Sequence, residues 1–255
     1  MKQIAVITGA SSGFGRELAR LLVHKRQVEE IWALARSPEK LRLLAEELGG
    51  KIRPMPLDVS SAGDLHRLEA RLAEEQPRIL YLVNSAGFGR FCSTEEMTLE
   101  ETLNMVDVNC AGLAGVTKLC LPWLHEGSRV LNVASQASFQ PLPYLNVYSA
   151  TKAFARNYSR ALNVELRPRG ITVTAVCPGW MKTAFFDRAK TDSDRAPRVF
   201  WGMAEPRRVA LRALLDAEHG RDISVYSPYV QLCHVTAKVL PQRAMMGLWM
   251  WQQKF

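Results

Sequence analysis

Tyr148 and Lys152 are residues whose types and spacing could perform acid–base chemistry. If the surrounding residues form a helix, the two side chains lie on one face, about one turn apart. A phenol loses its proton near pH ~10, and an ammonium group held beside it lowers that pKa. Such a tyrosine could pass a proton to or from a substrate oxygen near neutral pH. Two such residues also fall four apart by chance in many helices, so the interpretation depends on what the rest of the chain places beside them.

A glycine-rich segment near the start of the chain could bind a cofactor beside this pair. Residues 3–7 form a short apolar run that predicts a buried strand, and leucines at helical spacing follow from Leu18 to about Lys25. Between them lies Thr8-Gly-Ala-Ser-Ser-Gly-Phe-Gly15. Its glycines would let the backbone approach a pyrophosphate, and the free N–H groups of the helix N-terminus would face the negative charge. We predict a dinucleotide-binding turn here; the alternative is a structural turn without a ligand.

The remaining sequence alternates strand and helix patterns. Further strands are expected at residues 30–35, 51–56, 78–83, 128–134 and 171–177, with a seventh near 221–226, and a long helix at 147–167 would carry Tyr148 and Lys152. This alternation predicts an α/β Rossmann fold, in which about seven strands form a doubly wound parallel sheet flanked by helices. No Gly/Ser-rich or Pro-rich linker interrupts the chain, so we expect a single domain over residues 1–255.

The end of the second strand indicates which dinucleotide binds. An acidic residue there would bind a free ribose 2′-hydroxyl, whereas an arginine accommodates a 2′-phosphate. This sequence has Arg36 and no acidic residue between Ile31 and Pro38, which favours NADP(H) over NAD(H). Ser37 is expected to cap the next helix, with Pro38 at its first position. Asp58, after the third strand, could bind the adenine edge or cap the following helix.

Composition and charge exclude several classes of site. The five cysteines are widely spaced without a Cys-x-x-Cys motif, and the five histidines lack metal-ligand spacing, so we expect neither a disulfide framework nor a metal site. The formal net charge of +8 is scattered and no nucleic-acid recognition motif accompanies it, so we expect no nucleic-acid partner. An apolar strand begins almost at Met1, which argues against a signal peptide. No stretch approaches the roughly 18 apolar residues of a spanning helix, and we expect a cytoplasmic protein.

Taken together, the motifs over about residues 3–227 resemble the short-chain dehydrogenase/reductase family in its shorter-chain, non-extended branch. The glycine spacing of residues 8–15 matches that branch, and Asn84-Ser-Ala-Gly87 is similar to its Asn-Asn-Ala-Gly motif, with Ser85 in place of the second Asn. Pro178-Gly-x-x-x-Thr183 resembles its nicotinamide-side loop. The family's catalytic tetrad is matched in order and spacing by Asn109, Ser135, Tyr148 and Lys152.

The resemblance implies a role for each member of the tetrad. Tyr148 would give a proton to a carbonyl oxygen or take it from an alcohol, and Lys152 would lower the pKa of Tyr148 and bind the nicotinamide ribose. Ser135 would bind the substrate oxygen, and Asn109 would hold a water that links Lys152 to solvent. The implied cofactor-binding residues are Gly9, Ser11, Ser12, Gly13, Phe14, Gly15, Arg36, Ser37, Asp58, Val59, Asn84, Ala86, Gly87, Tyr148, Lys152, Pro178, Gly179, Met181 and Thr183.

The segments that would face the substrate are rich in aromatic residues. An apolar pocket wall would suit a bulky hydrophobic ketone or alcohol of steroid, retinoid or acyl type; alternatively, half of these residues belong to the core or to a subunit interface. The expected substrate-binding residues are Phe88, Ser135, Phe139, Tyr144, Trp180 and Phe185. We expect the protein to assemble as a homodimer or homotetramer.

The C-terminal segment, about residues 235–255, includes eight consecutive residues without a polar side chain, Ala244–Trp251. A helix here would be apolar on nearly all sides and too short to span a bilayer. Three interpretations remain open: it covers the substrate cleft or a dimer interface, it lies on a membrane surface with the help of Lys238, Arg243 and Lys254, or it belongs to the core. For the whole chain, an NADP(H)-dependent oxidoreductase is the leading prediction, and a sensing module that binds the cofactor without turnover is the alternative.

Overall fold

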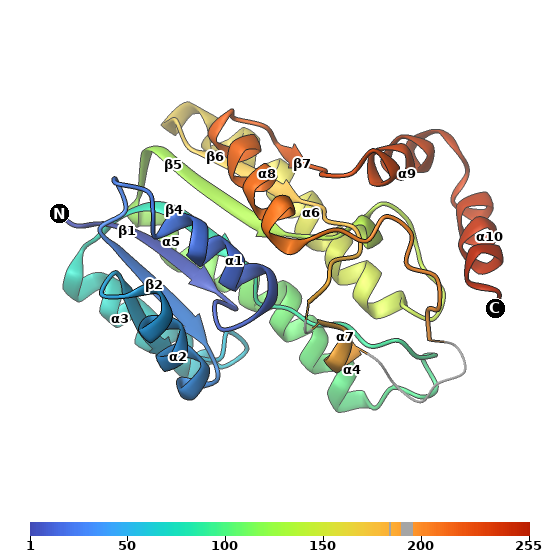
Figure 1. The fold of residues 1–255 in the computed structure, drawn as a ribbon, viewed down its shortest axis with the longest axis horizontal. Helices are drawn as coiled ribbons and strands as arrows, with labels where there is room; N and C mark the ends of the chain where they lie inside the picture. Colours follow the sequence, from blue (N-terminus) through green and yellow to red (C-terminus); the bar gives the residue numbers. More distant parts are fainter. Residues whose placement is uncertain (184, 190–195) are drawn as a thin grey trace.

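The computed structural model describes residues 1–183, 185–189 and 196–255. Within them lies one seven-stranded parallel sheet with the strand order β3-β2-β1-β4-β5-β6-β7 (Figure 1). The predicted doubly wound parallel sheet is therefore confirmed. The strands are β1 Gln3–Thr8, β2 Glu30–Ala35, β3 Ile52–Pro56, β4 Arg78–Asn84, β5 Leu124–Val133, β6 Thr172–Val176 and β7 Ile223–Ser224.

Helices cover both faces of this sheet, because the apolar side chains of a parallel strand point to both faces and each set must be buried. One face packs against apolar residues of α1, α2 and α8, such as Leu18, Leu41 and Leu214. The other face packs against α3, α5 and α6, through residues such as Leu68 and Leu162. The helices of the sandwich and its connections are α1 Gly13–Leu22, α2 Pro38–Leu48, α3 Ala62–Glu75, α4 Leu99–Val106, α5 Leu113–Cys120, α6 Asn146–Leu166, α7 Phe185–Ala189 and α8 Pro206–Glu218, with short 3-10 turns at Leu121–Trp123, Gln136–Ser138 and Arg167–Arg169.

Several helix starts follow the side-chain signals in the sequence. The Ser37 side chain accepts the Lys40 N–H at the start of α2, with Pro38 in the first turn. Thr98 and Glu101 form a capping box at the start of α4. A π-helical turn, Asp107–Gly112, which carries Asn109, separates α4 from α5. Such a turn inserts an extra residue into the helix and often marks a functional position.

Two strands differ in length from the sequence expectation. β5 begins at Leu124 rather than Ser128, and its register against β4 shifts between the Leu124 and Arg129 pairs. Gly127 takes a φ of +87° in this irregular stretch, and its N–H donates to the carbonyl oxygen of Gly170. The strand expected at 221–226 is reduced to the two residues of β7 because only Ala175 and Val176 of β6 pair with it.

The carboxyl ends of the central strands meet at one edge of the sheet. Thr8 pairs with Asn84, which pairs in turn with Asn132. The chain reverses its direction of winding between β1 and β4, so the loops after these strands diverge and leave a crevice, where ligands bind in sheets of this kind. A buried network holds the adjacent strands together: Asn84 Nδ2 donates to Asn132 Oδ1 at 2.8 Å and to Thr117 Oγ1 at 2.9 Å.

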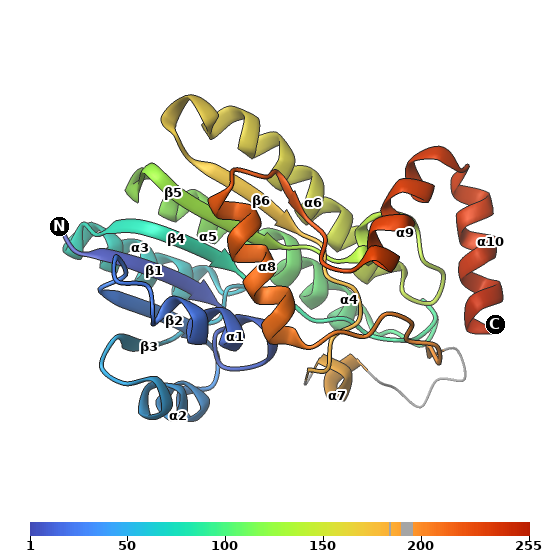
Figure 2. The ribbon, with the colours of Figure 1, turned by 45° about the horizontal axis from the view of Figure 1, so that its top comes forward.

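Two C-terminal helices, α9 Pro228–Val239 and α10 Gln242–Gln253, lie beyond the end of the sheet. Figures 1 and 2 both place them at the end of the molecule farthest from the N-terminus. Helix α10 buries Met245, Trp249 and Gln253 and exposes its opposite side. Apolar side chains do surround much of this helix, but the protein buries only the side that carries Met245 and Trp249. No helix in the described residues is long and apolar enough to cross a membrane.

Candidate active site

A cavity of about 660 Å³ opens at the carboxyl ends of the strands. The glycine turn and Arg36 line one part of it, and Ser135, Tyr148 and Lys152 line another. The glycine turn and the Tyr148–Lys152 pair lie far apart in the sequence, but in the structure both line the same cavity. The predicted cofactor-side residues in its wall are Gly9, Ser11, Ser12, Gly13, Phe14, Arg36, Ser37, Asp58, Val59, Ala86, Gly87, Tyr148, Lys152, Pro178, Gly179, Met181 and Thr183.

Gly15 and Asn84 lie behind this wall. A Cβ on Gly15 would lie 2.5 Å from the Gly9 carbonyl oxygen, so the glycine allows α1 to start close against the turn. Asn84 is buried in the network between β4 and β5. Both shape the site without lining it.

The glycine turn has a geometry that fits a pyrophosphate. Gly9 takes a φ of +66°, and a Cβ there would lie 2.9 Å from the backbone nitrogen of Ala86. Ser12 precedes α1 in extended conformation, its side chain makes no capping hydrogen bond, and no acidic residue occupies the first turn of the helix. The N–H groups at this helix end are therefore available to an anion in the cavity.

Arg36 and Lys40 place two cations at the far end of this turn. Arg36 is exposed, with its Nη1 3.9 Å from Asp58 Oδ2, and Lys40 lines the cavity from the first turn of α2. Asp58 does not cap α3; its Oδ1 accepts the N–H and the hydroxyl of Ser60, while Ser61 is the cap. Sequence reasoning missed Lys40 because its proximity to Arg36 depends on how α2 leaves the sheet.

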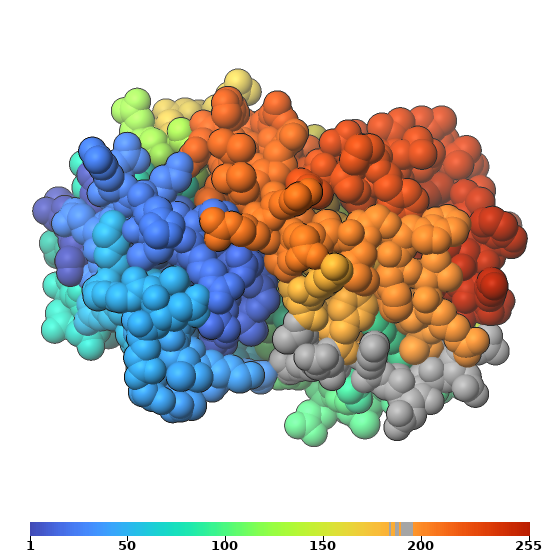
Figure 3. Space-filling model, viewed as in Figure 1, coloured from blue at the N-terminus to red at the C-terminus, as the bar shows by residue number. Residues whose placement is uncertain are grey.

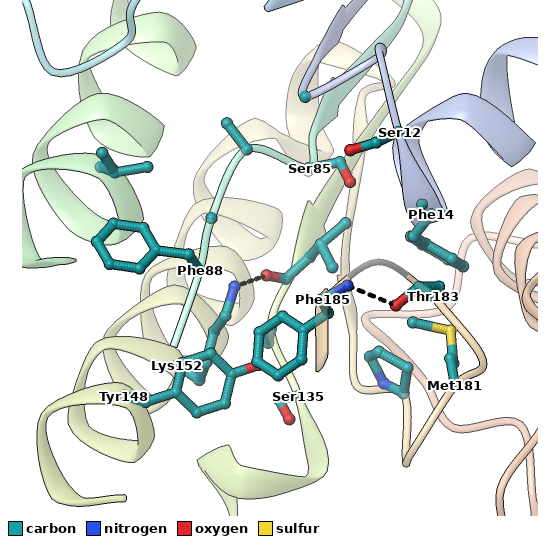
Figure 4. A pocket seen from close by; sticks show the side chains of 18 of the residues that line it. Ser12, Phe14, Ser85, Phe88, Ser135, Tyr148, Lys152, Met181, Thr183 and Phe185 are labelled. Carbon is teal, nitrogen blue, oxygen red and sulfur yellow. Dashed lines mark hydrogen bonds between the residues drawn. The ribbon is translucent and has the colours of Figure 1, made fainter. Parts of the chain in front are cut away.

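Tyr148 and Lys152 project from the first half of α6 toward the end of β5 (Figure 4). Lys152 Nζ donates to the Val133 carbonyl oxygen at 2.8 Å and lies 5.7 Å from the centre of the Tyr148 ring. Ser135 follows β5 at once, and its hydroxyl interacts with the Tyr148 phenol. Helix α6 and strand β5 thus bring three of the four predicted tetrad residues to the same part of the cavity.

Asn109, the fourth, lies behind the cavity on the π-helical turn. Its Oδ1 accepts the Phe88 N–H at 3.1 Å, and its Nδ2 donates to the Phe88 carbonyl oxygen at 2.9 Å and to Thr151 Oγ1 at 3.0 Å. A Cβ on Gly87 would lie 2.9 Å from Asn109 Oδ1 and 3.2 Å from Lys152 Nζ. Asn109 therefore fixes the loop after β4 against α6, close to the Lys152 ammonium.

Burial controls the protonation of the central pair. It raises the pKa of Tyr148 to about 12, against a smaller lowering by the Ser135 hydroxyl. It lowers the pKa of Lys152 to about 8. The expected lowering of the Tyr148 pKa by Lys152 is not present in this state of the site, because desolvation is the larger effect. Tyr148 is accordingly a proton carrier at neutral pH rather than a phenolate.

The other end of the cavity is apolar. Trp180 and Phe185 line it together with Ser135, and Phe88 borders the cavity while its ring packs in the core with Met105 and Val108. Phe139 and Tyr144 were expected there but do not line the cavity. Phe139 stacks on His234 of α9 with ring centres 4.5 Å apart, and Tyr144 packs against Phe255. Both rings pack against the C-terminal segment instead. The sequence around Phe139 and Tyr144 does not indicate where that segment docks.

The same docking supplies residues that the sequence did not assign to the site. Trp249 of α10 lines the cavity, is only 6% exposed and donates from Nε1 to the Pro143 carbonyl oxygen at 3.0 Å. Leu142 and Leu145 complete this wall together with Phe186, which belongs to the aromatic-rich segment that was expected to face the substrate. Gln136 also lines the cavity, and its buried Oε1 accepts no hydrogen bond from the residues that the structure describes. The apolar run 244–251 was the signal for Trp249, but it could not identify which residue would point inward.

Thr8 has a supporting role that the sequence also did not indicate. Its Oγ1 accepts the backbone N–H groups of Ser85 at 3.0 Å and Ala86 at 3.1 Å. The loop after β4 is therefore held to the end of β1. Over the described residues, no group of three or more His, Cys, Asp or Glu side chains is arranged to hold a metal ion.

Comparison with known proteins places this geometry in a family. The family model described as short chain dehydrogenase matches residues 3–194. Sulfoacetaldehyde reductase 2 of Chromohalobacter salexigens is 36% identical over 205 residues, which cover 77% of this chain and 79% of the relative. The 3-ketodihydrosphingosine reductase of Bacteroides thetaiotaomicron is 33% identical over 187 residues, covering 72% and 66%.

Solved structures share the fold over nearly the whole chain. A short-chain dehydrogenase from Sphingobium yanoikuyae in complex with NADPH has a TM-score of 0.79 and 27% identity, covering 97% of this chain and 95% of the other. A 3-ketoacyl-(acyl-carrier-protein) reductase from Brucella melitensis complexed with NADH has a TM-score of 0.74 and 26% identity, covering 88% and 95%.

The buried Lys152 gives folding stability a distinctive pH dependence. Its pKa falls from 10.5 to about 8 on folding. The unfolded chain therefore binds more protons between these values, and stability rises with pH across this window. Replacing Lys152 with Met should raise the free energy of unfolding by on the order of 2 kcal/mol at pH 7, and this gain should vanish toward pH 10.5.

Urea unfolding at pH 7, 8.5 and 10, without cofactor, would measure this difference, with the exposed Lys118→Met as the matched control. Loss of the hydrogen bond to Val133 offsets part of the gain. A Lys152→Met protein that is less stable than wild type at pH 7, by an amount that does not change with pH, would contradict the desolvation argument.

Proposed function

The chain belongs to the short-chain dehydrogenase/reductase family of oxidoreductases, and on that premise we propose that it is an NADP(H)-dependent enzyme that interconverts an apolar ketone and its secondary alcohol. The observation that carries the proposal is the shared cavity: an anion-binding glycine turn opens into the space where Tyr148, Ser135 and Lys152 converge. We infer a single domain over residues 1–255, in which residues 235–255 close the substrate end.

The residues present fit a dinucleotide along the cavity. The turn at Gly9–Gly15 and the start of α1 would hold its pyrophosphate, and Arg36 with Lys40 would face a 2′-phosphate. When bound, the nicotinamide supplies or accepts the hydride at the substrate carbon. Pro178, Gly179 and Thr183 border the same space and would position its ring.

Side chains of the protein would transfer the proton to and from the substrate oxygen. In reduction, Tyr148 gives the proton of its hydroxyl to the carbonyl oxygen as negative charge develops there, and in oxidation it takes that proton back. Its high pKa in the buried site favours the protonated donor. Ser135 donates a hydrogen bond to the same oxygen. Lys152, with a pKa of about 8, returns a proton toward Tyr148 and is held in place by the Val133 carbonyl oxygen.

The substrate end favours a neutral, apolar molecule. Among the described residues that line this part of the cavity, Lys152 is the only charged one, and the wall is otherwise formed by apolar side chains such as Trp180, Phe185 and Trp249. An anionic group would lose its hydration there and could pair only with the Lys152 ammonium, which already bonds the Val133 carbonyl oxygen. The relatives act on different compounds, a sulfoacetaldehyde in one and a 3-ketodihydrosphingosine in the other. The wall of this cavity fits the second kind of molecule better.

Removing the Tyr148 hydroxyl tests the reaction itself. Tyr148→Phe should lower kcat/KM for reduction of a hydrophobic ketone with NADPH by about 10²- to 10⁴-fold, the usual contribution of a positioned proton donor. Oxidation of NADPH, followed by absorbance, would measure it. Tyr158→Phe, the same change later in α6, is the control and should retain near wild-type rates. Full turnover by Tyr148→Phe would refute the assignment, whereas tight NADPH binding by wild type without turnover of any carbonyl would favour a sensing module.

Arg36 tests the choice of dinucleotide. Hydrogen bonds to a charged group contribute about 1.5–3 kcal/mol, so Arg36→Ala should weaken NADPH binding roughly 10- to 100-fold and leave NADH binding unchanged. Arg42→Ala, an exposed arginine on α2 that pairs with Glu39 and Glu46, is the control. Calorimetric titration with both dinucleotides would measure the affinities. Preference for NADH in wild type, unaffected by Arg36→Ala, would overturn the NADP(H) assignment.

Trp249 tests the apolar end of the cavity. Trp249→Ala should open space beyond Leu142 and Leu145 and shift specificity, measured as kcat/KM, by about tenfold or more toward ketones that are longer by several carbons. Trp251→Ala, two residues later on the same helix but 73% exposed, should leave the specificity unchanged. A chain-length series of ketones with saturating NADPH provides the measurement. Identical shifts in both variants, or none in Trp249→Ala, would exclude Trp249 from the substrate site.

A further inference from the structure

The C-terminal helices differ in charge from the rest of the chain. Residues 223–255 contain no Asp or Glu, and they carry Lys238, Arg243 and Lys254. All three cations are exposed, and none belongs to an ion pair within the residues that the structure describes. Elsewhere, exposed arginines such as Arg42 and Arg67 pair with neighbouring carboxylates. Within the described part of the chain, this segment is therefore a cationic surface that no Asp or Glu side chain neutralises.

The same segment exposes large apolar side chains in rows. On α9, Leu232, Val235 and Val239 are exposed at spacings of three and four residues, which places them on one face of the helix. On α10, Leu248 and Trp251 are exposed three residues apart, whereas Met245 and Trp249 are buried. Val239 is 76% exposed and Trp251 73%. Such a concentration of exposed apolar side chains on two consecutive helices marks an interaction site.

The position of the two helices makes this surface accessible. Figures 1 and 2 show α9 and α10 together at one end of the molecule, and Figure 3 shows the chain's C-terminal part forming that end of the surface. The inner side of α10 is occupied by its packing on Leu142 and Leu145 through Trp249. Its outer side has no protein neighbour among the described residues, and a partner could approach it without unfolding the helix.

We propose that α9 and α10 form a peripheral docking surface for an anionic lipid bilayer. Leu232, Val235, Val239, Leu248 and Trp251 would enter the headgroup boundary, and the three cations would contact anionic headgroups. A tryptophan with an exposed ring is suited to this depth, because its amphipathic indole favours the membrane–water interface. The eight apolar residues 244–251 are too few to span the bilayer, which fits a surface-bound helix rather than an inserted one.

Charge favours a bilayer over a second copy of the chain on this face. A two-fold interface would bring the acid-free surface of one subunit against the same surface of its partner, with Lys238, Arg243 and Lys254 present in both. Like charges placed together in this way disfavour association. An anionic lipid surface neutralises the same cations and covers the same apolar rows.

Docking through these helices would place the substrate end of the cavity beside the lipid. Trp249 lines the cavity from the inner side of α10, and Trp251 faces outward two residues later. An apolar ketone dissolved in the membrane would then reach the site without crossing water. This consequence rests on the proposed function, whereas the docking itself depends only on the surface.

Co-sedimentation of the full chain with vesicles tests the docking without cofactor or substrate. Wild type should sediment with vesicles of phosphatidylcholine containing about a third phosphatidylglycerol, and much less with phosphatidylcholine alone. Replacing Lys238, Arg243 and Lys254 together with Ala should weaken binding about 100-fold, at roughly fivefold per cation. The matched control replaces Arg26, Arg78 and Lys118, three exposed cations outside the segment, and should bind like wild type.

The apolar contribution is tested by Leu248→Ser combined with Trp251→Ser, with Val164→Ser on α6 as its control. Wild type should bind anionic vesicles with a blue shift of its tryptophan emission, and the double variant should lose both the binding and the shift. Reduction of a water-soluble ketone without vesicles should be unchanged, which separates failure of docking from failure of the reaction.

Three results would overturn the proposal. One is wild-type protein that stays in the supernatant with anionic vesicles at about 0.1 M salt, and another is a triple variant that binds as well as wild type. The third is a dimer in analytical ultracentrifugation that Leu248→Ser with Trp251→Ser dissociates, without vesicle binding by either protein. That result would assign the surface to a second copy of the chain.

Discussion

The arrangement of the site depends on one buried cation. Lys152 is almost fully removed from solvent, and its ammonium group is stabilised by the Val133 carbonyl oxygen at the end of β5. A buried ammonium requires such a partner, because desolvation without a hydrogen bond is costly. This requirement fixes α6 against the carboxyl end of β5. Tyr148, one turn earlier on α6, and Ser135, just after β5, are thereby brought into the same space, and Asn109 fastens the neighbouring loop.

The parallel sheet connects the region around Tyr148 and Lys152 to the glycine turn. The carboxyl ends of β1, β4 and β5 lie side by side, so the glycine turn after β1 and the serine after β5 open into one cavity. The loop after β4 lies between them and is held from both sides. Thr8 binds its backbone N–H groups from the β1 side, and Asn109 binds Phe88 from the helical side. A displacement of this loop would affect both halves of the cavity together.

Sequence reasoning succeeded where the structural cause is local. The glycine turn, the cap at Ser37, the capping box at Thr98 and the spacing of Tyr148 and Lys152 each depend on a few consecutive residues, and the strand alternation determines the sheet. It was less successful where distant segments meet. Trp249 and Lys40 reach the cavity through the docking of α10 and α2, and Phe139 leaves it because His234 offers a stacking partner. The π-helical turn at Asn109 likewise reflects packing, because Gly112 must approach Val59 closely.

The C-terminal helices combine a fixed orientation with an outer side that exposes apolar and cationic side chains. Helix α10 is anchored on its inner side by Trp249, whose indole N–H binds the Pro143 carbonyl oxygen, so its orientation is fixed rather than left to the surroundings. Its outer side and that of α9 then present apolar side chains, together with cations that form no ion pair among the described residues. An exposed apolar surface lowers the solubility of a protein unless a binding partner covers it. The family model ends at residue 194, before these helices begin. Helix α10 still contributes Trp249 to the cavity wall, so the same helix would link the proposed substrate site on its inner side to the proposed docking surface on its outer side.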